Sequence, residues 1–396
     1  MMLKQVFFAI IVLMNNKKIL ILSTAYYPLI GGAEVAIKEI TDRIEDIEFD
    51  LLTARMDKNL PKNEKIGNVN VFRFGFGYAF IDKILLAFLG HRKAQKLHKQ
   101  NNYNTVWAMM ASHGGLAASK FKAKNPNIKF LLTLQEGDSL EYIYKKTRFI
   151  KRQFKNIFIK ADRIQCISKY LADWAKDMGA KSPIEIIPNG VDVDVFSQKY
   201  SEDELNKLKL EMDKKDGDKF IITTSRLSYK NAIDDLIKSI IYLPNNFKLL
   251  ILGEGEDKVK LEIIVKENNL GNRVRFLGFV DYKELPKYLR ISDVFVRASL
   301  SEGFGNSFVE AMVTKIPVIA TPVGGIVDFL EDEKTGLFCK VKDPESIAEK
   351  IKKIIDDDEL RSRIIENAHQ MVIDRYDWNL IALDMKKVFD SLILGK

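Results

Sequence analysis

The chain has 396 residues, of which 46% are hydrophobic and 29% are charged, which excludes a disordered or fibrous protein and predicts two globular domains. The net charge of +8 is unevenly distributed. Residues 1–190 carry 30 Lys and Arg against 17 Asp and Glu, whereas residues 191–396 carry 32 against 37. A basic half of this kind is typical of a surface that meets an anionic partner, and charge alone leaves nucleic acid and anionic lipid both open.

The first 16 residues form a predicted N-terminal extension. They carry an apolar run at residues 6–14, and nine residues are too few for a membrane-spanning helix, which needs about 20. No small-residue cleavage site follows the run. Three interpretations stay open: a dispensable extension with Met14 as the real start, a shallow membrane anchor, and a secretion signal.

From residue 18 onward, short apolar runs alternate with helical patterns, which is typical of parallel sheets covered by helices. The first half has predicted strands at 19–22, 49–52, 69–72, 105–107, 130–134, 163–167 and 184–187. The second half has predicted strands at 220–224, 248–252, 274–277, 294–298 and 318–320. A charged stretch at 200–218 predicts a domain junction within 190–218, and residues 378–394 predict an amphipathic helix.

The predicted first strand leads to Gly31-Gly32-Ala33-Glu34, where a helix is expected to begin. The free N–H groups at a helix N-terminus favour an anion, so this turn is a weak signal for a phosphate-bearing ligand. His113, in the sequence Ser-His-Gly-Gly, follows another predicted strand. A ligand contact and a packing role are both open for its imidazole. Cys166 and Cys339 have no metal-ligand spacing, and we expect both to be buried in a reducing compartment.

Two basic stretches of the first half also carry aromatic residues. Residues 74–80 read Phe-Gly-Phe-Gly-Tyr-Ala-Phe and precede a basic helical pattern at 82–99. Residues 142–160 interleave Lys and Arg with three phenylalanines. Ordinary amphipathic helices, contact with an anionic membrane surface and nucleic-acid binding are all open, although no nucleic-acid reader motif accompanies the charge.

Two cations follow the first predicted strand of the second half, in Ser225-Arg226-Leu227-Ser228-Tyr229-Lys230. Open α/β sheets bind ligands at the carboxyl ends of their strands, so Arg226 and Lys230 are placed to neutralise a diphosphate and to stabilise it as a leaving group. For this pair alone, ordinary surface charge is also open. Gly253 closes the next predicted strand and allows a ligand to approach the backbone closely.

The most informative segment is Ser301-Glu302-Gly303-Phe304-Gly305-Asn306-Ser307-Phe308-Val309-Glu310. Gly303 and Gly305 allow a sharp turn, and the residues after them predict a helix whose N-terminus favours an anion. Glu302 precedes that helix, and Glu310 lies about two turns inside it. Two carboxylates beside an anion site suit a ligand with a phosphate and several hydroxyls, which means a sugar nucleotide. From this segment alone, a strand–loop–helix connection with two solvated glutamates is also open.

Eight segments resemble the retaining glycosyltransferases of family 4 (glycosyl transferases group 1): GGAE at 31–34, IPNGVD at 187–192, SRLSYK at 225–230, LGEG at 252–255, RFLGFV at 275–280, SEGFGNSFVEAM at 301–312, PVIATPVGG at 317–325 and TGLF at 335–338. The resemblance covers nearly the whole chain from Lys17 onward. It implies an α/β protein with the GT-B fold, in which two Rossmann-like domains with parallel sheets face each other and a C-terminal helix crosses back to the first. The implied ranges are 1–16 for the extension, 17–195 for the acceptor-side domain, 196–375 for the nucleotide-sugar-binding domain and 376–396 for the crossover helix.

The resemblance also implies roles for individual residues. Glu302 would bind hydroxyls of the transferred sugar and Glu310 the ribose, while Arg226 and Lys230 would hold the diphosphate. The leaving diphosphate would assist deprotonation of the acceptor hydroxyl in a front-face, retaining reaction. No cofactor and no metal are expected, since the donor substrate is itself a GDP- or UDP-linked sugar. The implied donor-binding residues are Gly31, Gly32, Arg226, Lys230, Gly253, Glu302, Gly303, Phe304, Gly305, Asn306, Ser307 and Glu310.

Three features depart from the family pattern. Gln135 stands where the family usually has a histidine whose imidazole contacts the sugar, so either the Gln135 amide makes that contact or Asp138 or His113 takes part of that role. Many members have a lysine five residues after the arginine, whereas here Lys230 is fourth and Asn231 is fifth. The sequence Asp192-Val193-Asp194 resembles a metal-binding motif, but the family needs no metal at that point.

We therefore predict a metal-independent hexosyltransferase whose catalytic residues are Arg226, Lys230, Glu302 and Gln135. It would move a mannose- or glucose-type hexose to a glycan or lipid-linked acceptor in surface polysaccharide or glycoconjugate synthesis. Its expected location is the cytoplasm, with peripheral attachment to the inner face of the cell membrane as one interpretation. A UDP-sugar 2-epimerase-like isomerase and a non-enzymatic basic membrane-binding protein are the alternatives. The nucleotide base, the hexose, the acceptor and the oligomeric state do not follow from the sequence.

Overall fold

The protein is described by a computed structural model that covers residues 17–395, so the apolar run at 6–14 lies outside the described residues. The described chain divides into two compact units. The first comprises residues 17–136, 140–189 and 378–395, and the second comprises residues 137–139 and 190–377. The functional domain boundaries expected at 195 and 375 stay a prediction.

The first unit contains an eight-stranded sheet in the order β3-β4-β2-β1-β5-β6-β7-β8. Its neighbouring strands are parallel except for the β3–β4 pair. The central strands are continuous apolar runs because helices cover both faces of a parallel sheet. The strands are β1 (Lys18–Leu22), β2 (Glu48–Ala54), β3 (Asn63–Ile66), β4 (Val69–Phe74), β5 (Thr105–Met109), β6 (Lys129–Leu134), β7 (Arg163–Cys166) and β8 (Ile184–Ile186).

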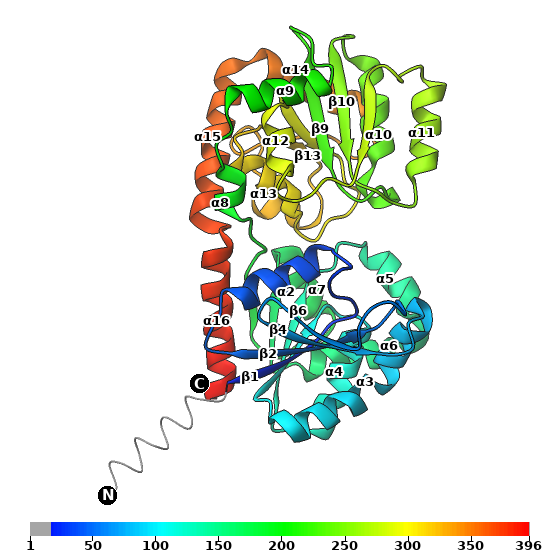
Figure 1. Cartoon of the computed structure of the whole chain (residues 1–396), viewed down its shortest axis with the longest axis vertical. Coiled ribbons are helices and arrows are strands. Elements are labelled where there is room, and N and C mark those ends of the chain that lie inside the picture. The colour runs from blue at the N-terminus through cyan, green and yellow to red at the C-terminus, as the bar shows by residue number, and fades with distance from the viewer. Residues whose placement is uncertain (1–16, 396) are drawn as a thin grey trace, which may run out of the picture. The chain divides into compact units, whose positions relative to one another are not determined.

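The C-terminal helix α16 (Trp378–Leu394) belongs to the first unit, as the crossover helix of the predicted fold requires. It packs beside α2, and Figure 1 shows it in red next to that helix. The Phe389 ring lies edge-on to Phe49 and Trp107, with ring centroids 5.9 and 5.1 Å apart. The other helices of this unit are α2 (Gly32–Asp42), α3 (Ala79–Asn101), α4 (His113–Lys124), α5 (Leu140–Thr147), η1 (Arg148–Ile150), α6 (Lys151–Lys160) and α7 (Lys169–Asp177).

The second unit contains a six-stranded parallel sheet in the order β11-β10-β9-β12-β13-β14. Because β9 and β12 are neighbours and run in parallel, the loops that follow them lie at the same edge of the sheet. The strands are β9 (Lys219–Thr224), β10 (Phe247–Leu252), β11 (Val274–Gly278), β12 (Val294–Arg297), β13 (Val318–Ala320) and β14 (Leu337–Phe338). These two sheets confirm the predicted α/β class.

The helices of the second unit include one inside the charged stretch at 200–218. Residues 202–211 form α9, and a capping box between Ser201 and Glu204 explains why so polar a segment is helical. Both cysteines are buried, as predicted. The helices of this unit are α8 (Val193–Ser197), α9 (Glu202–Glu211), η2 (Tyr229–Asn231), α10 (Ile233–Ser239), η3 (Ile240–Tyr242), α11 (Lys258–Glu267), α12 (Leu285–Arg290), α13 (Asn306–Val313), η4 (Gly324–Asp328), α14 (Pro344–Asp356) and α15 (Asp358–Arg375).

Candidate functional site

The loop after β12 makes a sharp turn into α13. Gly305 is the N-cap of this helix and has a φ of 97°, a left-handed conformation that side chains rarely adopt. A Cβ at this position would also lie 2.5 Å from the Phe308 ring. The helix begins at Asn306, so its first N–H groups face the end of the loop, where an anion is favoured.

Glu302, in this loop, is a buried carboxylate with a buried cationic partner. Its side chain accepts a hydrogen bond from the guanidinium of Arg297, the last residue of β12, and both residues are only 9% exposed. The second oxygen of Glu302 accepts from the Gly303 N–H at 3.1 Å. Sequence analysis missed Arg297, although a charged residue that ends the apolar strand Val294–Arg297 was a visible signal.

Glu310 differs from Glu302 because no side chain or backbone group within residues 17–395 pairs with its carboxylate. It lies half-buried on α13. Burial raises the pKa of Glu310 to about 7, and the positive charge of Arg297 offsets only part of that effect. The two glutamates that the sequence analysis considers together therefore lie in different environments. The carboxylate oxygens of Glu310 remain available to accept hydrogen bonds from a ligand.

The two cations of the loop after β9, Arg226 and Lys230, differ in their ion pairing. The exposed Arg226 forms no ion pair with any acidic residue of the described chain, and its carbonyl accepts from Asn231 Nδ2 at 2.6 Å. Lys230 Nζ donates to Asp138 Oδ1 at 3.0 Å, and Asp138 belongs to the short segment 137–139 of the second unit. A Cβ on Gly137 would lie 3.1 Å from Lys230 Nζ and 3.5 Å from Glu302 Oε1, so the Lys230 ammonium and the Glu302 carboxylate both lie next to Gly137.

Two predicted donor-binding residues have a structural explanation of their own. A Cβ on Gly253 would collide with the Ser225 carbonyl oxygen, so the packing of the two loops already requires glycine there. The Phe304 side chain is 1% exposed and packs on Phe329 and Tyr376, with ring centroids 5.1 and 5.5 Å apart. Only the backbone of Phe304 is therefore placed to meet a ligand.

The predicted residues of the first unit gather where β1, β5 and β6 end. Gly31 is the N-cap of α2, and a Cβ on Gly32 would meet no atom within 4 Å, so the protein fold leaves open space there. His113 is the first residue of α4. Burial, and then the charges of Lys83 and Lys146, lower the pKa of His113, so its imidazole is neutral at pH 7.

Gln135 pairs with the amide of Asn189. Its Nε2 donates to Asn189 Oδ1 at 3.0 Å, and Asn189 Nδ2 donates back at 3.2 Å. Next to it, the buried Glu136 accepts from the N–H groups of Ala111 at 2.6 Å and of Gln135 at 2.9 Å. Glu136 thus ties the loop after β5 to the end of β6, a role that sequence analysis missed because both contacts are made by backbone groups.

Asp192, of the sequence that resembles a metal motif, caps α8 by accepting from the Val195 N–H at 3.1 Å. Within residues 17–395, no group of acidic, histidine or cysteine side chains is arranged to hold a metal ion. In the same range, no helix is long and apolar enough to cross a bilayer.

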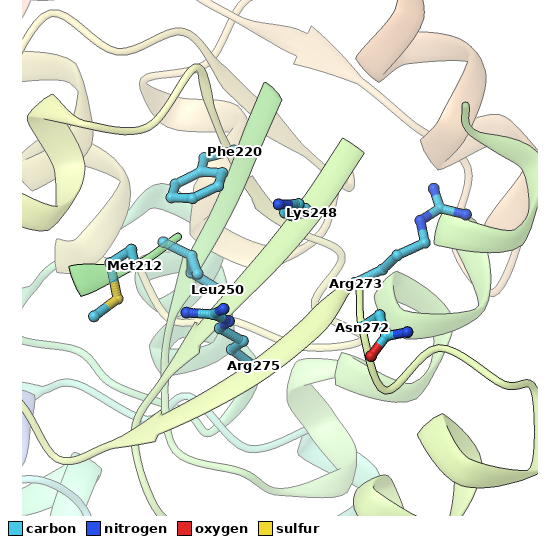
Figure 2. Close-up of a pocket in the computed structure, with 7 residues that line it drawn as sticks. All are labelled: Met212, Phe220, Lys248, Leu250, Asn272, Arg273 and Arg275. Carbon is cyan, nitrogen blue, oxygen red and sulfur yellow. The ribbon is translucent and has the colours of Figure 1, made fainter. Parts of the chain in front are cut away.

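A shallow hollow lies at the opposite edge of the second sheet, where β9, β10 and β11 begin (Figure 2). Two of its three cations are paired with carboxylates, Lys248 with Asp218 at 2.6 Å and Arg275 with Asp213 at 3.7 Å, and the guanidinium of Arg273 is occupied by backbone carbonyls. We therefore assign no ligand to it. It is lined by Met212, Phe220, Lys248, Leu250, Asn272, Arg273 and Arg275.

Two family models match this chain: Glycosyltransferase Family 4 over residues 30–195 and Glycosyl transferases group 1 over residues 206–371. The chain belongs to glycosyltransferase family 4, a family of retaining, metal-independent enzymes with the GT-B fold. It is a glycosyltransferase that takes a sugar from a nucleotide sugar. This membership supports a transferase over the isomerase and the non-enzymatic binding protein.

Similar proteins cover most of the chain. An uncharacterized glycosyltransferase of Methanocaldococcus jannaschii is 28% identical and covers 94% of this chain and 98% of its own length. The alpha-monoglucosyldiacylglycerol synthase of Acholeplasma laidlawii is 26% identical over 80% of this chain and 83% of its own. The crystal structure of HepE from Anabaena, in complex with UDP-glucose, has a TM-score of 0.79 at 21% identity and covers 94% of this chain and 99% of its own. That likeness shows the shared fold.

Proposed function

We propose that the second unit binds a nucleotide-diphosphate sugar at the edge where β9 and β12 end. The observation that carries this proposal is the half-buried carboxylate of Glu310, which has no partner within the described residues 17–395. Burying a carboxylate without a partner is costly, and neutral hydroxyl donors such as those of a ribose would offset that cost. The protein supplies no such donor from residues 17–395, so a ligand is the natural source.

The remaining roles follow from position. Glu302 would bind hydroxyls of the transferred sugar, since its hydrogen bonds from Arg297 and the Gly303 N–H leave part of its acceptor capacity unused. Arg226 and Lys230 would hold the diphosphate, with help from the first N–H groups of α13. The helix-start residues Asn306 and Ser307, and the backbone of residues 303–305, would line the same site.

The reaction would be a front-face transfer with retention. The diphosphate gains negative charge as the glycosidic bond breaks, and Arg226 and Lys230 would stabilise that charge more strongly in the transition state than in the bound donor. The departing phosphate oxygen would accept the proton of the acceptor hydroxyl. The protein would thus contribute positioning and electrostatics rather than a carboxylate nucleophile.

The first unit would serve the acceptor and the reaction centre through Gly31, Gly32, His113 and Gln135. Asp138, in the 137–139 segment of the second unit, would be a further sugar contact. The open space beside Gly32 favours close approach of a substrate to the backbone. The Gln135 amide is paired with Asn189, so it would have to exchange part of that pair to reach the sugar. His113 would contribute a neutral imidazole.

For the substrates, we propose a UDP- or GDP-linked glucose- or mannose-type donor and a glycan or lipid-linked acceptor of surface glycoconjugate synthesis. The support is that one relative is named a glucosyldiacylglycerol synthase and one similar structure holds UDP-glucose. A cytoplasmic protein attached peripherally to an anionic membrane would fit a lipid-linked acceptor. The basic first half of the chain supports this attachment.

A thermal-shift screen tests the proposal. Wild-type protein and the Glu310→Gln variant would be heated with UDP, GDP, UDP-glucose and GDP-mannose. A donor that binds the folded state raises the wild-type melting temperature by mass action, and we expect a smaller rise in the variant. Release of the nucleoside diphosphate from the selected donor would then be measured with lipid and glycan acceptors. Equal shifts in both proteins would contradict the role of Glu310.

A further inference from the structure

Arg297 is a buried charge that stability alone does not explain. It ends β12 in the middle of the second sheet, and its side chain is 11% exposed. Replacing a buried ion pair by apolar side chains of similar size is often neutral or stabilising. An apolar residue would continue the strand Val294–Val296 at no desolvation cost, so the presence of this arginine calls for a role.

The guanidinium joins three segments that the proposed donor site uses. In the loop after β12, it donates to Glu302 and, through Nε, to Ser299 Oγ at 3.1 Å. At the start of α13, its Nη1 donates to Ser307 Oγ at 2.7 Å. In the loop after β9, its Nη2 donates to Asn231 Oδ1 at 3.2 Å. Among these four side-chain partners only Glu302 is charged, so the ion pair is directed at that carboxylate.

Asn231 shows how this arrangement differs from one with a lysine in the loop after β9. Asn231 is 2% exposed, and the same Arg297 nitrogen donates both to its Oδ1 and to Glu302. A lysine at 231 would bring its ammonium to the position of that nitrogen, where two like charges repel. Asn231 and Arg297 are thus mutually compatible, and either a long cation at 231 or an arginine at 297 can meet Glu302.

We propose that Arg297 is the positioning residue of the donor site, and that it fixes the Glu302 carboxylate for the hydroxyls of the transferred sugar. This inference rests on the proposed function of Glu302. Arg297 does not touch the substrate. It pairs with Glu302 on the side away from the proposed sugar. Its hydrogen bonds to Ser307 and Asn231 also fix the start of α13 and the loop after β9 relative to that carboxylate.

A double-mutant cycle tests the coupling. Arg297→Gln, Glu302→Gln and the double variant would be compared for kcat/KM with whichever of UDP-glucose and GDP-mannose stabilises the wild-type protein. We expect Arg297→Gln to lower kcat/KM by about tenfold or more and the double variant to be no worse than Glu302→Gln within about twofold, since both changes remove one interaction. The Kd for UDP or GDP should change by less than about threefold in all variants when it is measured well above pH 7, where Glu310 stays ionised without the positive charge of Arg297.

A charge relocation adds a gain-of-function arm. Asn231→Lys should reduce transfer because its ammonium meets Arg297, and Arg297→Leu should reduce it because Glu302 loses its partner. The combined Asn231→Lys, Arg297→Leu variant should regain at least about half, on a logarithmic scale, of the kcat/KM that Arg297→Leu alone loses, because the ammonium at 231 then pairs with Glu302. A residue that only supports the fold would not be rescued in this way.

Arg273→Gln is the matched control, because Arg273 is a half-buried arginine of the same unit whose bonds go to the carbonyls of Leu243, Pro244 and Phe247. It should lose thermal stability without losing kcat/KM in the folded protein. The inference would be overturned if the kcat/KM losses of Arg297→Gln and Glu302→Gln multiplied in the double variant. A loss of UDP or GDP affinity as large as the loss of kcat/KM would also overturn it. So would a folded Asn231→Lys, Arg297→Leu variant that recovers no transfer. Wild-type transfer by Glu302→Gln would instead overturn the proposed function, so the two failures are distinguishable.

Discussion

The two sheets present different chemistry at the edges where their strands end. In the second unit, this edge carries the buried pair of Arg297 with Glu302, together with a cation at Arg226 and a carboxylate at Glu310 that have no ion-pair partner among residues 17–395. In the first unit, the predicted residues are glycines, a neutral His113 and an amide of Gln135 that is satisfied by Asn189.

This difference follows from what each edge would bind. A donor diphosphate carries charge and gains more as it leaves, so its site must hold charges that the protein does not neutralise by itself. An acceptor hydroxyl is neutral, and a site built from amides, glycine and a neutral imidazole can orient it without a desolvated ion. The following tests ask whether charge in the second unit controls catalysis and nucleotide binding as this comparison requires.

The largest effect is expected at the exposed cation. Arg226→Ala should lower turnover at saturating donor by about tenfold or more, because about 1.4 kcal/mol of transition-state stabilisation is lost for each factor of ten. Steady-state release of the nucleoside diphosphate measures it. Arg275→Ala is the control, since that arginine lies at the opposite edge of the same sheet. Wild-type turnover by Arg226→Ala would remove this residue from the diphosphate site.

The two glutamates should fail in different ways. Glu310→Gln should weaken the affinity for the free nucleoside diphosphate by about fivefold to tenfold, because hydrogen bonds to a charged group are worth about 1.5–3 kcal/mol and the amide retains part of them. Glu302→Gln should leave that affinity near the wild-type value and impair sugar transfer. Isothermal calorimetry with UDP or GDP separates the two, and equal losses of affinity in both variants would show that the assigned roles are wrong.

The pH dependence of nucleotide binding should report Glu310. Burial raises the pKa of Glu310 to about 7, and the ionised carboxylate is the form that accepts hydrogen bonds from ribose hydroxyls. Affinity should therefore be high above pH 7 and fall as the pH decreases through 7, by up to about tenfold between pH 8 and pH 6. The Glu310→Gln variant controls for titration of the nucleotide itself, and the same slope in both proteins would contradict this assignment.

Much of the fold could be predicted because each parallel strand is a short apolar run between turn and helix signals. The five predicted strands of the second sheet lie within one residue of β9 to β13 at either end. Two strands were missed for physical reasons: β3 (Asn63–Ile66) is a polar edge strand, and β14 (Leu337–Phe338) is too short to show any period. The helix α9 was hidden by its charge, although its capping box was present in the sequence.

The site was predictable where function depends on local motifs and not where it depends on distant contacts. The turn at Gly305 and the helix that follows it were visible in consecutive residues. The pairing of Arg297 with Asn231 spans 66 positions and that of Gln135 with Asn189 spans 54, and no local pattern shows such pairs. For the same reason, the sequence did not show that the Phe304 side chain is buried in the core, and the motif alone predicted the whole residue to contact the donor.

The first unit also differs from the second in its exposed aromatic side chains, which lie in basic segments. In the first unit, Phe76, Phe80 and Phe149 are 68%, 77% and 83% exposed, a large apolar exposure for single side chains. Their segments are basic, and Lys83 of α3 and Lys146 of α5 both act electrostatically on His113, which places the two segments on the same side of the unit. Exposed aromatic rings among cations are typical of surfaces that contact anionic membranes.

The smallest effect is expected for membrane attachment. A chain that begins at Met14, and so lacks most of the apolar N-terminal run, should bind vesicles that contain anionic lipid and not vesicles of neutral lipid alone. Binding should decline as salt is raised, because exposed charges are screened beyond about 8 Å at physiological ionic strength. Phe149→Ser should weaken cosedimentation by about fivefold, since one buried aromatic ring contributes about 1 kcal/mol to insertion. Phe279→Ser is the matched control, because Phe279 is 74% exposed in the acidic second unit. If the Met14 chain ignores anionic vesicles at low salt, the basic surface is only solvated, and a soluble glycan acceptor is the better assignment.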